Sequence, residues 1–136
     1  MPKNGQTLVE FALILPVFLF LIVVIFDFGR AVYYYSTIHN AAREGARYGV
    51  IHPGTADYAA IAARAEEYAV GLGISDITVD VNAGPDENVA DMDNPTIKVT
   101  VSYSFRPVTP FVTNLLCGCP AITLSSDAVM RTEALP

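Results

Sequence analysis

The first feature of the chain is a stretch, residues 11–26, that contains no polar residue and is bounded by Glu10 and Asp27. Taken from residue 8 to residue 28, this segment would extend roughly 31 Å as a helix, which matches a bilayer core of about 30 Å. A cleaved secretory signal has a shorter apolar core that ends in small residues. This run instead continues into a helical pattern. It therefore predicts one membrane span that stays attached to the chain, with the short end that carries Lys3 in the cytoplasm.

Pro16 lies inside the predicted span. It removes the hydrogen bond to the carbonyl of Ala12 and crowds that turn, which costs about 3 kcal/mol in water. Membrane helices tolerate such interruptions where neighbouring groups satisfy the backbone. The residue pattern alone therefore indicates a kinked membrane anchor.

A helical period continues beyond the span, from residue 31 to about residue 50. The residues at spacings of three and four that define one face are Val32, Tyr35, His39, Ala42, Ala46 and Gly49. The small residues on this face would allow the rest of the domain to approach the helix backbone closely. We therefore expect one helix over about residues 6–50, half of it membrane span and half of it cover for a domain, ended by Pro53 and Gly54.

A second, alanine-rich helix is predicted over residues 55–71. Thr55 is its expected N-cap, and the glycines at positions 71 and 73 are expected to end it. Its expected buried stripe consists of Tyr58, Ile61, Ala65, Tyr68 and Leu72.

From residue 77 onward the apolar period changes from helical to two. Apolar and polar positions alternate over residues 77–82 and 96–105, which is typical of half-buried strands in an antiparallel sheet. A third strand, residues 122–131, alternates less regularly because Val129 falls among the polar positions, which indicates either a bulge or an outward contact. Such a sheet needs a cover on its apolar face, and the 31–50 half of the long helix supplies it. The predicted fold is therefore α+β, a helical stalk with a small three-stranded sheet domain, like a lollipop.

A short polar leader ends in Gly5, and Glu10 follows five residues later at the start of the apolar run. This arrangement resembles the processing site of a type IV prepilin, in which the cut would fall between Gly5 and Gln6. The string DFGR at residues 27–30 and the string AAREGARYG at residues 41–49 resemble the signature of TadE-like proteins of the tight-adherence pilus system. Residues 99–111 and 127–133 also resemble the closing part of that family, so the likeness extends over nearly the whole chain.

The resemblance implies a division into a leader (residues 1–5), a transmembrane and filament-core helix (residues 6–30) and an extracellular α+β domain (residues 31–136). It implies a structural pilus subunit that is processed by a prepilin peptidase and held in the bacterial cytoplasmic membrane. The pilus assembly machinery would then polymerise this subunit into a surface filament through its N-terminal helices. The alternatives within the same system are a membrane-anchored minor pseudopilin or assembly factor and a tip adhesin.

Six residues are candidates for roles in assembly: Glu10, Pro16, Asp27, Arg30, Arg43 and Arg47. An ionised group in hydrocarbon costs several kcal/mol unless it is paired, so Glu10 is expected to have a partner. In the implied filament Glu10 would neutralise the freed amine of Gln6 on a neighbouring subunit, and the helix near Pro16 would stretch as subunits leave the membrane. In an unprocessed chain Lys3 is the nearest cation for Glu10.

The other charged candidates lie farther along the helix. Asp27 is expected near the membrane interface opposite to that of Glu10, and Arg30 follows it in the family-like string. Arg43 and Arg47 are four residues apart and share a face. That face is either solvated or in contact with acidic groups of the same or a neighbouring subunit.

The acidic balance of the chain argues against nucleic-acid binding. Eight Lys plus Arg face 14 Asp plus Glu, for a net charge of −6, whereas phosphate neutralisation needs clustered cations. The two histidines, His39 and His52, have no further metal ligands beside them in the sequence and are expected to be structural. The sequence holds no recognisable phosphate-binding loop, nucleophile elbow or acid-base cluster. It therefore favours a structural protein over an enzyme, with neither a cofactor nor a resident metal.

The loop from residue 83 to residue 95 is rich in oxygen ligands that could hold calcium. Its acidic residues are Asp86, Glu87, Asp91 and Asp93. Their spacing lacks the ordered alternation and the central glycine of a helix-loop-helix calcium site. The alternative is a solvated connecting loop without a metal.

The only cysteines, Cys117 and Cys119, lie in a connection that spans residues 106–120. Outside the cell an even cysteine count favours a disulfide, and Gly118 makes the tight ring feasible. One intervening residue strains such a bond, so free thiols and bridges between chains are the alternatives. The same connection carries the apolar residues Phe111, Val112, Leu115 and Leu116. Exposed in a monomer these would be unfavourable, and we expect them to pack against a neighbour.

Overall fold

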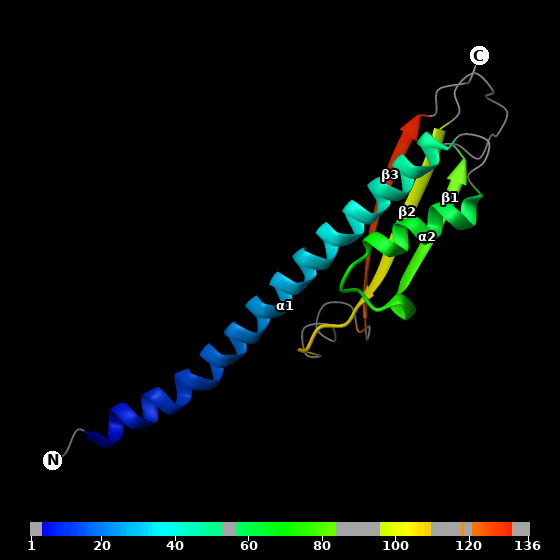
Figure 1. Cartoon of the computed structure of the whole chain (residues 1–136). Helices are drawn as coiled ribbons and strands as arrows, with labels where there is room; N and C mark the ends of the chain where they lie inside the picture. The colour runs from blue at the N-terminus through cyan, green and yellow to red at the C-terminus, as the bar shows by residue number, and fades with distance from the viewer. Residues whose placement is uncertain (1–3, 53–56, 84–95, 110–117, 119–120, 132–136) are drawn as a thin grey trace.

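The long helix α1 (Asn4–Ile51) dominates the computed structural model of the chain (Figure 1), which describes residues 4–52, 57–83, 96–109, 118 and 121–131. It contains 48 residues and is therefore about 70 Å long. The helix continues through Pro16 without interruption. Its N-terminal half projects away from the domain and its C-terminal half runs along it, which confirms the predicted stalk (Figure 1).

The domain is built on the predicted three-stranded antiparallel sheet, and its strands lie in the order β1-β2-β3. The strands are β1 (Ile77–Ala83), β2 (Thr96–Phe105) and β3 (Ile122–Arg131). Val101 in the central strand lies between Val79 of β1 and Ser126 of β3. The buried residues of β2 alternate as the sequence predicts: Val99, Val101, Tyr103 and Phe105.

Strand β3 pairs with β2 over its whole length without a bulge, so the bulge considered near Val129 is wrong. Val129 lies on the outer face of the sheet, 46% exposed, opposite Lys98. The inward positions on either side of Asp127 are Ser126 and Ala128, and both are buried. Small side chains at these positions leave room for α1, which packs directly on β3.

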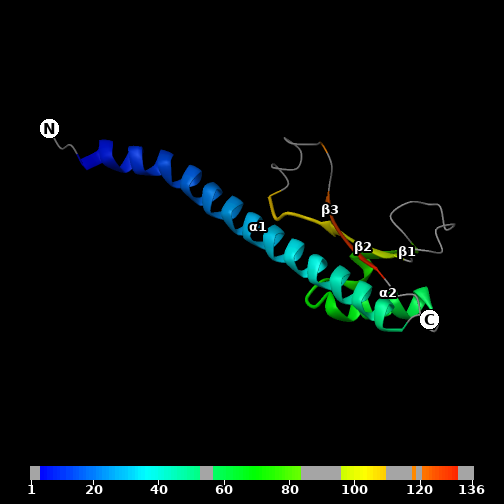
Figure 2. The ribbon, with the colours of Figure 1, turned by 90° about the horizontal axis from the view of Figure 1, so that it is seen from above.

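Both helices cover the same face of the sheet and form a two-layer α+β domain (Figure 2). Helix α1 contacts β2 and β3, while α2 (Tyr58–Tyr68) contacts α1 and β1 and is followed by the short 3-10 helix η1 (Ile74–Asp76). The largest fully buried side chains are Ile38, Ile61, Val99 and Val101, from α1, α2 and β2. The core therefore lies where the C-terminal half of α1 crosses the sheet.

The face that α1 turns to the sheet differs in its first half from the predicted one. Val32 and Tyr35 are 52% and 51% exposed, and His39 is exposed as well. The buried face runs instead through Tyr34 and Ile38 and then through the small residues from Ala41 to Gly49. The prediction went wrong because apolar and aromatic residues surround this part of the helix. Tyr34 faces the sheet because its ring packs edge-on against the rings of Tyr103 and Phe105, with ring centres 5.1 Å and 5.8 Å apart.

Helix α2 is shorter than predicted. It begins after Asp57, which makes no side-chain capping bond, and it ends at Tyr68, whereas the predicted N-cap Thr55 lies outside the described residues. Tyr58 and Tyr68 are 54% and 41% exposed, so they do not belong to the buried stripe. The other members of that stripe, Ile61, Ala65 and Leu72, are buried as expected.

Gly45 lies where α1 approaches both layers of the domain closely. A Cβ atom at this position would lie 3.0 Å from Cβ of Ala65 and 3.3 Å from Cγ1 of Val99. We expect Gly45→Val to destabilise the fold by about 2–3 kcal/mol through overpacking and to lower the melting temperature by roughly 10–20 °C. Thermal unfolding of the full chain in detergent, followed by circular dichroism, measures this shift.

Gly29 on the same helix supplies the matched control, because a Cβ there would meet no atom within 4 Å. Gly29→Val is expected to change stability by no more than about 0.5 kcal/mol, since valine and glycine differ little in helix propensity. Equal melting shifts for the two variants would contradict the close approach at Gly45.

Candidate assembly helix and its anchor

The N-terminal half of α1 presents large apolar side chains, most of which are exposed in the described structure. Among residues 5–26 every side chain is exposed except Ile22 and Val24, which are half-buried. A continuous apolar surface of this size is typical of a membrane or protein contact. Among the described residues this is the one helix long and apolar enough to cross a bilayer.

The predicted processing and assembly residues lie along this exposed half. Gly5 and Gln6 are in the first turns of α1 and are exposed. Glu10 follows about one turn later, is also exposed, and is the only ionisable residue between positions 5 and 26. Lys3, its expected partner in an unprocessed chain, lies outside the described residues. Any contact that buries this half of α1 therefore buries one carboxylate with it.

Asp27 ends the exposed half and is only 7% exposed. Its carboxylate accepts hydrogen bonds from the backbone N–H groups of Val108 and Thr109, each at 3.0 Å, and from the hydroxyl of Thr109 at 2.6 Å. Nη1 of Arg30 lies 3.4 Å from the same carboxylate. We call Asp27, Val108 and Thr109 the Asp27 anchor, because these bonds fix the chain just after β2 to the helix.

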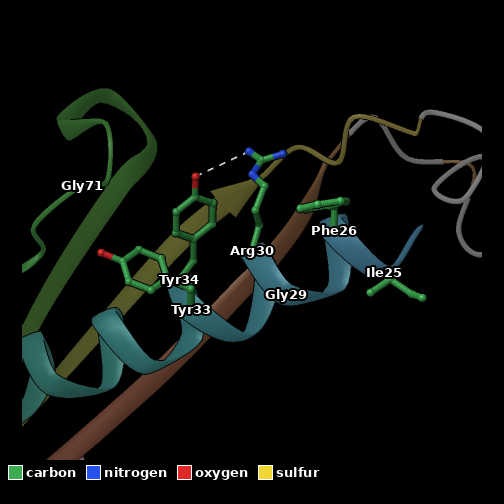
Figure 3. A pocket seen from close by; sticks show the side chains of 7 residues that line it. All are labelled: Ile25, Phe26, Gly29, Arg30, Tyr33, Tyr34 and Gly71. Atoms are coloured by element: carbon green, nitrogen blue, oxygen red, sulfur yellow. Dashed lines mark hydrogen bonds between the residues drawn. The ribbon is translucent and has the colours of Figure 1, made fainter. Parts of the chain in front are cut away.

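Arg30 lies one turn after Asp27, and aromatic rings hold its guanidinium. The Cζ atom lies 5.6 Å from the ring centre of Tyr34 and 5.5 Å from that of Phe105. Nη2 lies 3.5 Å from the Tyr34 hydroxyl (Figure 3). Beneath them Tyr103 packs on Tyr34, and burial raises the pKa of the Tyr103 hydroxyl. The cation–π contacts position Arg30 while 41% of its side chain stays exposed.

An open groove of about 430 Å³ lies beside Arg30, where the exposed half of α1 meets the domain (Figure 3). The residues of α1 that line it are Ile25, Phe26, Gly29, Arg30, Tyr33 and Tyr34. Its far edge is Gly71, in the turn after α2, whose φ of +83° favours glycine. Among the described residues that line it, Arg30 is the only charged one, and the others are glycine, aliphatic or aromatic.

Arg43 and Arg47, the remaining assembly candidates, lie on the solvent side of the domain half of α1, and both are exposed. Nη1 of Arg47 lies 3.9 Å from Oε2 of Glu44 in the preceding turn. Exposed pairs of this kind contribute about 0–1 kcal/mol. The structure brings these two arginines to neither the Asp27 anchor nor the groove.

Both histidines make contacts within the chain. Nδ1 of His39 lies 3.0 Å from the hydroxyl oxygen of Ser126 and links α1 to β3. His52, at the end of α1, lies with Nδ1 3.1 Å from the carbonyl oxygen of Tyr48 and packs on the Tyr48 ring. The described residues contain no group of three or more metal-ligating side chains. The acidic loop considered for calcium and the pair Cys117 and Cys119 lie outside the described residues.

Comparison with known families singles out the same helix. Residues 5–47 match the family model of TadE-like proteins. The match confirms the expected resemblance over these residues and spans the predicted processing site, Glu10, the DFGR string and the helix up to Arg47. It does not extend to residues 99–111 and 127–133, where a resemblance was also predicted. TadE-like proteins form a family associated with the tight-adherence pilus. No curated protein and no solved structure gives a significant match to the chain.

The matched segment therefore contains Asp27, whereas Val108 and Thr109, the other two residues of the Asp27 anchor, lie outside the match. Val108 and Thr109 were not recognised from the sequence, because a threonine after a strand carries no signal of a distant partner. Phe105 was predicted only as a core residue, and its contact with Arg30 was also missed. The signal that was present is the carboxylate itself, since an acidic residue at the end of an apolar run requires donors.

Proposed function

We propose that this chain is a structural subunit of an extracellular tight-adherence pilus, inserted in the cytoplasmic membrane and then polymerised through α1. The observation that carries the proposal is the exposed apolar half of a TadE-like helix with a single carboxylate, Glu10, near its start. Lipid covers such a surface before assembly, and the helices of other copies cover it afterwards. The domain from residue 31 onward remains outside the membrane.

Burial of Glu10 among helices makes the assembly selective. An unpaired charge in an apolar environment costs several kcal/mol, and a bundle that supplies a cation removes this penalty. Apolar helices alone can slide past one another, whereas a buried ion pair forms in only one register. Glu10 is therefore the residue that fixes the position of one copy against the next. In this proposal prepilin peptidase processes the subunit, and the assembly machinery moves it from the membrane into the filament.

The test is the intact mass of the chain in sheared and purified surface filaments, compared with its mass in the membrane fraction. We expect abundant subunit in the filaments that begins at Gln6, because processing frees the helix for packing. A filament subunit that begins at Met1 would support the structural role and contradict leader removal. A chain confined to the membrane fraction would contradict the proposal and favour an anchored accessory protein, and trace amounts at filament ends would favour a tip adhesin.

Gly5→Leu supplies a control for the processing step. A Cβ at Gly5 would meet no atom within 4 Å, so the substitution leaves the fold unaffected. We expect this variant to keep the mass of the full chain in the membrane and to be depleted at least tenfold from filaments. Normal cleavage of the variant would contradict the assignment of the processing site.

A further inference from the structure

The groove at Arg30 and the exposed helix that carries Glu10 are complementary in both shape and charge. We propose that the groove is the docking site for the N-terminal helix of a second copy of this chain, with Glu10 of that copy paired to Arg30. This inference rests on the proposed filament role, and it names the cation that neutralises Glu10. It differs from the pairing with the freed amine of Gln6 that the family resemblance implies.

Arg30 retains the capacity to bind a second carboxylate. Its contacts with Asp27 at 3.4 Å and with the Tyr34 hydroxyl at 3.5 Å are both long, and its side chain is 41% exposed. Asp27 in turn receives three shorter bonds from Val108 and Thr109, so it is stabilised largely without Arg30. A guanidinium has five N–H donors, and its planar fork suits a carboxylate.

The side chains around Glu10 suit the rest of the groove. Leu13 and Ile14 lie on the same side of α1 as Glu10, at helical spacings of three and four residues, and are 72% and 58% exposed. Phe11, the next residue along the chain from Glu10, is 62% exposed. In the copy that supplies the groove of about 430 Å³, the lining includes Phe26 and Tyr33, which are 70% and 56% exposed. Docking would therefore cover apolar side chains of both copies and remove the paired charges from water together.

The same geometry restricts the contact to the assembled state. Glu10 precedes Arg30 by 20 residues, which is about 30 Å along a helix. Two copies at equal depth in a bilayer hold these residues near opposite interfaces, so they cannot meet. A copy that has moved outward by about 30 Å brings its Glu10 level with Arg30 of the next copy. The pairing therefore sets an axial stagger of about 30 Å between the two helices in contact.

Photocrosslinking in purified filaments tests this contact. Phe11 is replaced by the photoreactive residue benzoylphenylalanine, filaments and membranes from the same cells are irradiated, and the joined peptides are identified by mass spectrometry. We expect crosslinks from position 11 to residues 25–34, at least tenfold more abundant in filaments than in membranes. Within one chain positions 11 and 30 are about 28 Å apart along a continuous helix, so such a product joins two copies.

Two controls sharpen the result. The same photoreactive residue at Phe18, which is 56% exposed, is expected to give no product with residues 25–31, because the stagger places it farther along the neighbour. Arg30→Gln in the position 11 background is expected to lower the crosslink at least fivefold, while Arg131→Gln, at the exposed end of β3, leaves it unchanged. Thermal unfolding in detergent verifies that the Arg30 variant is folded.

Crosslinks from position 11 to residues 5–10 of another copy would overturn the inference in favour of the amine pairing, and crosslinks only to lipid would overturn it in favour of a headgroup contact. Either result in filaments leaves the structural role of the chain intact. Absence of the chain from wild-type filaments would overturn both the filament role and the docking site.

Discussion

Replacement of Glu10 by alanine is expected to deplete the chain from surface filaments by at least a hundredfold while leaving it in the membrane. The cation that meets Glu10 in the bundle would be left buried and unpaired, and removal of one partner of a buried ion pair costs about 3–5 kcal/mol. That loss recurs at every subunit contact, and each 1.4 kcal/mol is about tenfold in an equilibrium constant. The measurement is the ratio of subunit in sheared filaments to subunit in membranes, by quantitative immunoblot.

The matched control is Glu67→Ala, which removes an exposed carboxylate of α2 that pairs with Arg64 in the preceding turn. This change is expected to leave the filament ratio within about twofold, since exposed pairs contribute little. Because Glu10 is exposed, Glu10→Ala should also leave the melting temperature of the folded chain unchanged. Wild-type filament amounts with the Glu10→Ala subunit would contradict the role of this carboxylate in assembly.

The parts of the fold that the sequence predicted are those that a single periodic pattern determines. Strand β2 is the clearest case, because a period of two with Val99, Val101 and Tyr103 on one side leaves only one face to bury. The length of α1 was predictable for the same reason, since the apolar run continues into a helical pattern without a turn signal before Pro53. Local patterns of this kind do not depend on which segments meet.

The parts that failed depend on contacts between distant segments. The first half of the α1 face was misassigned because several faces there carry apolar or aromatic residues, and only the positions of Tyr103 and Phe105 select Tyr34. Asp27 was expected at a membrane interface, and that expectation did not reveal its bond to Thr109, 82 residues later. The groove at Arg30 likewise requires Gly71, which approaches only after the domain has folded.

The Asp27 anchor is expected to be the most sensitive polar site of the fold. Asp27→Ala leaves two backbone N–H groups and the Thr109 hydroxyl without their acceptor. Hydrogen bonds to a charged group contribute about 1.5–3 kcal/mol each and are not additive. We expect a loss of about 3–5 kcal/mol in the free energy of unfolding and a fall of at least about 10 °C in the melting temperature of the full chain in detergent.

Asp127→Ala is the matched control for this prediction, because its carboxylate is 58% exposed and lies 4.0 Å from Nζ of Lys98, so the expected change is below about 1 kcal/mol. Thr109→Val removes only the hydroxyl donor and should fall between the two, at about 1–2 kcal/mol. This order separates the anchor from a general effect of charge, since Asp27→Ala and Asp127→Ala change the net charge equally. Equal melting temperatures for those two variants would show that the Asp27 bonds do not stabilise the domain. The expected order of melting temperatures would instead show that Asp27 links the membrane half of α1 to the chain after β2. The domain would then move together with the helix during assembly.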